Sequence, residues 1–130
     1  MISLKHFSAA ALLIFLPSCT VDIHVGKAPK LRHVVVAWLK DHGNAAQRTQ
    51  LLEAGDKLRT IPGVQQVVMG QCLPSPRPVV DSTFDVAYVM TFADAEHLQQ
   101  YLVHPTHVQL VKDVLKPLTK RLQVYDLIEP

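Results

Sequence analysis

The stretch from Leu31 to Leu39 constrains the fold of this 130-residue chain more than any other feature. It reads LRHVVVAWL, so it is rich in β-branched residues and apolar at both odd and even positions. Successive side chains of a strand point to opposite faces of its sheet. The pattern therefore predicts a strand that is buried on both faces.

Other segments of the chain also have strand character. Further strands are predicted at residues 64–72, 84–92 and 122–127. The strand at 84–92 is again apolar on both faces. Between the second and third strands, residues 73–82 carry Pro74, Pro76 and Pro78 in alternation, which favours an extended surface loop.

Two helical regions separate the strands. Asn44 and Gln47 have the spacing of a capping box at the start of the first helix, and Pro62-Gly63 ends that region. Asp94 is expected to cap the second region, which His104-Pro105 interrupts.

Thr106 is expected to cap the continuation of the second helical region. The predicted order is then β-α-β-β-α-β, an α+β arrangement of the ferredoxin-like kind. Its helices cover one face of a four-stranded antiparallel sheet. No helix is left for the other face, so a second copy of the chain is expected to cover it, which predicts a homodimer. Trp38 is expected in the core or at this dimer interface.

The first 18 residues have the layout of a secretory signal. Lys5 and His6 precede an apolar run at residues 7–16 that is too short to span a bilayer. The alternative is a buried N-terminal helix, but Pro17 ends the run. We expect a signal peptide at 1–18, a tether at 19–30 and one folded domain at 31–130.

The end of this segment, Leu16-Pro17-Ser18-Cys19, resembles the lipobox of bacterial lipoproteins. That resemblance implies acylation of Cys19 and a lipid anchor in the cell envelope. Because Thr20 and not Asp follows, it further implies the outer membrane, with the domain facing the periplasm. Cys72 would then be a free, half-buried thiol. The rival interpretation is a Cys19–Cys72 disulfide.

Charge and motif content exclude several functions. The chain has 13 Lys and Arg against 11 Asp and Glu, with no basic stripe, so nucleic acid is not an expected partner. It carries no glycine-rich phosphate loop, no Ser-His-Asp order and no paired acids. Nucleotide hydrolysis and the common hydrolase mechanisms are therefore not expected, and no cofactor is predicted.

Three segments together resemble the stress-responsive dimeric α/β-barrel (Dabb) family. They are His33 in the first strand, Ile61-Pro62-Gly63-Val64 after the first helix, and the run from Tyr101 to His107 with His104-Pro105 inside it. The resemblance spans residues 31–127. It implies a dimer whose two sheets form a barrel, with a cavity between each sheet and its helices.

The resemblance also implies a candidate site. A plant polyketide cyclase of this family uses a His–Tyr pair, to which His107 as base and Tyr101 as its partner correspond, and His33 resembles a further pocket histidine. Where the cyclase has another histidine, this chain has Asp85.

The residues alone fit a second interpretation of His33 equally well, as a histidine of the core or of the dimer interface. His104 and His107, with His33, could in principle hold a metal, but His104 precedes a proline and no metal is predicted. Three functions remain open. They are a stress-associated module that binds a small apolar ligand, a small-molecule cyclase or lyase, and a structural oligomer whose barrel builds larger assemblies.

Overall fold

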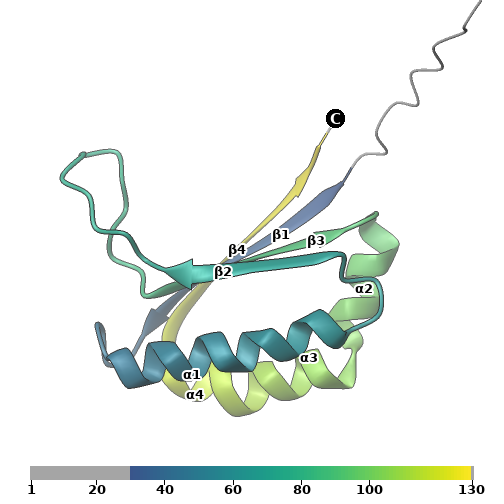
Figure 1. Ribbon diagram of the computed structural model, residues 1–130, viewed down its shortest axis with the longest axis horizontal. Helices are drawn as coiled ribbons and strands as arrows, with labels where there is room; N and C mark the ends of the chain where they lie inside the picture. Colours follow the sequence, from purple (N-terminus) through teal and green to yellow (C-terminus); the bar gives the residue numbers. More distant parts are fainter. Residues whose placement is uncertain (1–29, 130) are drawn as a thin grey trace, which may run out of the picture.

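The computed structural model describes residues 30–129 (Figure 1). Four strands occupy β1 (Leu31–Leu39), β2 (Gln66–Gln71), β3 (Val86–Phe92) and β4 (Thr119–Ile128). The helical segments are α1 (Ala45–Asp56), the 3₁₀ turn η1 (Lys57–Thr60), α2 (Ala95–Val103), α3 (Pro105–Leu110), the π-helical turn η2 (Val111–Leu115) and α4 (Lys116–Leu118). The predicted order is confirmed. β4 starts three residues earlier than predicted, and β2 and β3 are shorter.

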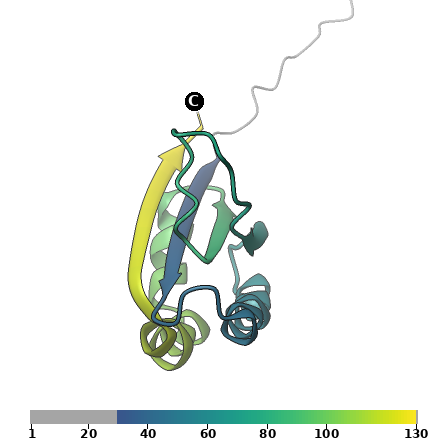
Figure 2. The same ribbon diagram turned by 90° about the vertical axis from the view of Figure 1, so that its left-hand side faces the viewer.

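The strands form one antiparallel sheet in the order β2-β3-β1-β4. Figure 2 shows β1 and β4 side by side along their length. The register pairs His33 with Met90 on β3 and with Asp126 on β4. Because partners across a ladder share a face, these three side chains lie on the same side of the sheet.

The helices pack on one side of the sheet, as Figure 1 shows. The hydrophobic core lies between the sheet and these helices. Odd-numbered residues of β1 and even-numbered residues of β3 point into it, and Ala37, Val86 and Phe92 are wholly buried there. α1 approaches β3 closely at Gly55, where a Cβ atom would lie 2.7 Å from the Tyr88 ring.

The other side of the sheet, which we call the open face, carries Val34, Val36, Val68, Val89 and Tyr125. Val68 and Tyr125 are about half exposed, and the ribbon shows no helix over them. β1 and β3 are therefore apolar on both faces, as predicted.

The helix starts confirm two predicted caps, Asn44 of α1 and Asp94 of α2, and correct a third. The Asp94 carboxylate accepts the His97 N–H at 2.9 Å. The Asn44 side chain accepts the Gln47 N–H at 3.0 Å, but the Asn44 N–H donates to the Asp41 carbonyl and not back to Gln47. α3 is capped by His104, whose Nδ1 accepts the Thr106 N–H at 3.2 Å. The prediction of Thr106 as the cap was therefore wrong, because Pro105 already occupies the first helical position, where its missing N–H costs nothing.

The π-helical turn η2 was not predicted. It lies just before Pro117, which has no N–H to donate and whose ring would clash with the carbonyl four residues earlier. At the end of this helical region the Thr119 hydroxyl donates to the Leu115 carbonyl at 2.7 Å. A turn of this kind widens the helix, and η2 borders the cavity described below.

The predicted signal peptide, Cys19 and the tether lie outside the described residues. Within residues 30–129, no helix is both long and apolar enough to cross a membrane. Cys72 is half-buried and forms no disulfide with another residue of this range.

Candidate functional site

The three residues singled out from the sequence line one cavity of about 220 Å³ between the sheet and the helices. His33 comes from β1, Tyr101 from α2 and His107 from α3. The remaining wall is apolar and includes Val35, Leu58, Met90, Leu115 and Val124. The cavity is therefore mostly apolar and has a few polar groups that come from three elements. Sites that bind small molecules typically have this composition.

Tyr101 stands between the two histidines. Its ring centroid lies 4.5 Å from that of His107 and 5.9 Å from that of His33, and Phe92 packs on it at 5.0 Å. The side chain is 1% exposed, and within residues 30–129 its hydroxyl makes no hydrogen bond. Burial raises the pKa of Tyr101 well above its ordinary value, so the phenol is neutral.

His107 is held by the backbone of the helix before it. Its Nδ1 donates to the Leu102 carbonyl at 2.9 Å, because a carbonyl can only accept. In the neutral ring, Nε2 is then an acceptor. Burial lowers the pKa of His107, with His33 and His104 adding to the effect against the opposing Leu102 hydrogen bond. The imidazole is therefore neutral at pH 7 and able to accept a proton.

His33 has a partner that sequence reasoning missed. Its Nδ1 lies 2.6 Å from Oδ1 of Asp126, directly across the β1–β4 ladder. The His33 side chain is 6% exposed and the Asp126 side chain 51%. The carboxylate therefore accepts a hydrogen bond from the Nδ1–H of His33.

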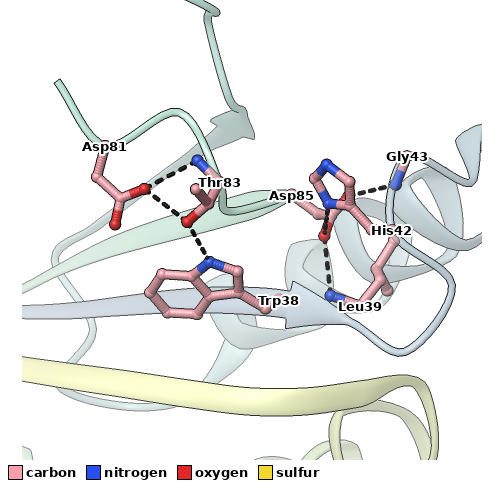
Figure 3. A network of polar contacts seen from close by, with 7 residues as sticks. All are labelled: Trp38, Leu39, His42, Gly43, Asp81, Thr83 and Asp85. Atoms are coloured by element: carbon pink, nitrogen blue, oxygen red, sulfur yellow. Dashed lines mark hydrogen bonds and ion pairs between the residues drawn. The ribbon is translucent and has the colours of Figure 1, made fainter. Parts of the chain in front are cut away.

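A second polar cluster lies at the other end of β1 (Figure 3). The buried Asp85 carboxylate accepts the backbone N–H groups of Leu39 and Gly43 at 2.9 and 2.8 Å, and His42 Nδ1 at 3.0 Å. Burial by itself raises the pKa of Asp85, but these hydrogen bonds outweigh it and hold the pKa below its ordinary value. Asp85 does not line the cavity of His33, Tyr101 and His107.

A metal site formed by His33, His104 and His107 was the alternative considered for these histidines. In the described part of the chain, no group of three or more His, Cys, Asp or Glu side chains is placed to hold an ion. His104 turns Nδ1 to the Thr106 N–H, and His107 turns Nδ1 to the Leu102 carbonyl.

Fold and cavity together define an α+β domain of the ferredoxin-like kind that encloses a small apolar site. A family model described as the stress responsive A/B barrel domain, Dabb, matches residues 31–129. The chain belongs to this family. The sequence has no significant match among curated proteins.

Solved structures agree with this assignment. A Dabb family protein with a ferredoxin-like fold from Mesorhizobium loti is 26% identical, with a TM-score of 0.66 over 78% of this chain and 98% of that one. A dimeric ferredoxin-like protein of unknown function from Thermobifida fusca is 19% identical, with a TM-score of 0.65 over 79% and 93%. A hydroxynitrile lyase from Passiflora edulis is also 19% identical, with a TM-score of 0.68 over 80% and 96%.

Proposed function

We propose that this protein is a homodimeric, stress-associated module that binds a small apolar molecule in the cavity between its sheet and helices. One observation carries the proposal: His33, Tyr101 and His107 meet in a cavity that is otherwise apolar. Within residues 30–129 the Tyr101 hydroxyl makes no hydrogen bond and His107 bonds only through Nδ1, so both side chains can pair with a ligand in the cavity.

Cavity size and charge narrow the ligand class. A dry cavity of about 150 Å³ already accepts a benzene ring, so about 220 Å³ suits one ring or a short branched chain with a substituent. The neutral Tyr101 and His107 offer a hydrogen-bond donor and an acceptor. They favour an uncharged molecule with a hydroxyl or carbonyl at one end.

Native mass spectrometry of the full chain, purified gently from the cell envelope, tests this. We expect wild type to carry a small organic molecule that is lost in Tyr101→Phe and His107→Ala. The matched control is His97→Ala, which changes an exposed histidine paired with Asp94 outside the cavity. Retention of the molecule by both cavity variants would contradict the proposal.

Acid–base chemistry in the same cavity is a second candidate function. It is favoured by His107, whose Nδ1 is fixed by Leu102 so that Nε2 can take a proton from a substrate, with Tyr101 able to hydrogen-bond the substrate's oxygen. The fold also carries a lyase, as the Passiflora edulis enzyme shows, although 19% identity transfers no residue role. Slow chemical change of the captured ligand by wild type, absent in His107→Ala, would distinguish catalysis from binding.

Two observations support the homodimer. The open face exposes apolar side chains that water solvates poorly, and the Thermobifida fusca relative is a dimer. Native mass spectrometry of the same sample counts the copies directly. A monomer at every concentration would contradict this part of the proposal.

Attachment to the outer membrane, with the domain in the periplasm, is proposed on the lipobox-like Leu16-Pro17-Ser18-Cys19. A diacylated cysteine would anchor the chain stably, since each buried methylene contributes about 0.8 kcal/mol. Labelling of growing cells with an alkyne analogue of palmitate is expected to mark wild type and not Cys19→Ala. Equal labelling of both, or of neither, would contradict it.

A further inference from the structure

The loop between β2 and β3 is built as a rigid arm. Residues 73–82, here called the arm, contain three alternating prolines. The Ser75 N–H donates to the Ser82 hydroxyl at 3.1 Å, and the Val80 N–H donates to the Arg77 carbonyl at 3.0 Å. Alternating prolines and internal hydrogen bonds restrict the backbone, so the arm keeps its shape at low entropic cost.

The root of the arm is fastened to the open face of the sheet. Trp38 lies on that face, because its neighbours Ala37 and Leu39 are wholly buried on the core side. The Trp38 indole N–H donates to the Thr83 hydroxyl at 2.8 Å (Figure 3). Phe84 packs edge-on against the same ring.

Further bonds brace this root. The Thr83 hydroxyl donates to Asp81 at 2.6 Å, and the Arg121 guanidinium stacks 4.2 Å from the centre of the Trp38 ring on the open face. Figure 1 shows the arm rising from the end of β2 on the side away from α1. The arm is therefore held beside the open face and projects beyond it.

The arm exposes apolar side chains that its own chain does not cover. Leu73 is 83% and Val79 89% exposed, the highest values among the large hydrophobic residues of the described range. Because these side chains adjoin the apolar open face, they extend it into a larger apolar surface, and such surfaces are typical of protein contacts.

A second copy of the chain is the occupant that the observations favour. The Thermobifida fusca neighbour of the same fold is dimeric, and the open face is apolar and partly exposed. The root of the arm contacts Trp38 on that face, so a partner seated on the open face reaches the arm.

We propose that the arm of each protomer grips a second copy of this chain, with Leu73 and Val79 packed against the partner when the two open faces meet. The inference rests on the homodimer of the proposed function and assigns a specific surface to it. It is independent of any ligand in the cavity. In a symmetric dimer each arm residue acts twice.

Dissociation constants of the full chain in mild detergent test the proposal. Leu73→Asp combined with Val79→Asp is expected to weaken the dimer about 100-fold, because two charges per arm must be desolvated. Val103→Asp is the matched control, since Val103 is 75% exposed at the end of α2, on the helical side. We expect less than about a 2-fold change for it.

A photo-crosslinker in place of Val79 supplies a second measurement. It is expected to form a covalent dimer with the attachment point on the partner's open face or arm. A wild-type dimer that the double Asp variant leaves intact, with cross-links only inside one chain, overturns the arm and leaves the homodimer standing. A wild-type chain that stays monomeric overturns both.

Discussion

Two histidine–aspartate pairs lie at opposite ends of β1, and they differ in which partner is buried. In the pair formed by His33 and Asp126, the histidine is buried at 6% exposure and the aspartate is 51% exposed. In the pair formed by His42 and Asp85, the aspartate is buried at 1% exposure and the histidine is 56% exposed. The Nδ1–carboxylate distances are similar, at 2.6 and 3.0 Å.

The buried member of each pair indicates what the pair does. Asp85 receives three hydrogen bonds, two of them from backbone N–H groups at the end of β1 and in the turn after it, so its charge holds that turn against the strand. His33 contacts the Asp126 carboxylate and also lines the cavity, so Asp126 orients a ring at the candidate site. The pair of His42 and Asp85 therefore stabilises the fold, and the pair of His33 and Asp126 positions a ring at the candidate site.

The largest expected effect follows from breaking the structural pair. Asp85→Ala leaves the Leu39 and Gly43 N–H groups without their acceptor, and we expect a loss of about 3 kcal/mol or more in the free energy of unfolding. Urea unfolding measures it. The control, His42→Ala, removes only the exposed partner and should cost less than about 1 kcal/mol. Equal losses in the two variants would contradict the assignment of the structural role to the carboxylate.

The two buried tyrosines extend the comparison. The Tyr88 hydroxyl donates to the Leu51 carbonyl at 3.0 Å and ties β3 to α1, whereas that of Tyr101 faces the cavity. Tyr88→Phe is expected to lose about 1 kcal/mol of stability, and Tyr101→Phe less than about 0.5 kcal/mol. Urea unfolding of both variants checks the difference. A larger loss in Tyr101→Phe would indicate a structural hydroxyl there.

Most of the fold could be predicted from the sequence because the deciding signals are local. The two-sided apolar pattern of Leu31–Leu39, the Asn44 cap and the Pro62-Gly63 stop each act within a few residues. Gly63 adopts φ +86°, which glycine tolerates. The π-helical turn before Pro117 was not predicted, although a proline late in an apolar helical pattern indicates that the regular helix is interrupted there.

The site was predicted in part, and for a different reason. His33, Tyr101 and His107 were identified through a family resemblance, since no local pattern brings β1, α2 and α3 together. Asp126 and the Leu102 carbonyl were missed because their roles depend on strand register and helix packing. A register drawn with His33 opposite residue 126 would have revealed Asp126.

Removal of Asp126 is expected to have a smaller effect on stability than removal of Asp85. Asp126→Ala should cost less than about 1 kcal/mol, because water can reach the His33 Nδ1 in place of the half-exposed carboxylate. The same change should release the ring from its single tautomer, in which Nδ1 carries the proton. Nitrogen-15 NMR of the histidines reads the tautomer directly.

Asp56→Ala is the control for this variant, since Asp56 at the end of α1 is a similarly exposed acid paired with Arg59 of η1. It should leave the His33 signal unchanged. An unchanged His33 tautomer in Asp126→Ala would show that the carboxylate does not orient the ring.

The smallest expected effect is the pH dependence contributed by His107. Burial lowers the pKa of His107 in the folded chain below its ordinary value of 6.5, so the unfolded chain takes up the proton first as the pH falls. The stability that the neutral ring contributes is therefore complete above about pH 6.5 and is lost as the pH falls below that value.

Wild type should lose more stability than His107→Gln between about pH 7.5 and 5.5, as urea unfolding would show. The difference is small because the ring is only half-buried and water screens its charge. Parallel loss in both proteins would mean that His107 is no more desolvated than an exposed histidine, and a cavity that wet would suit an apolar ligand poorly.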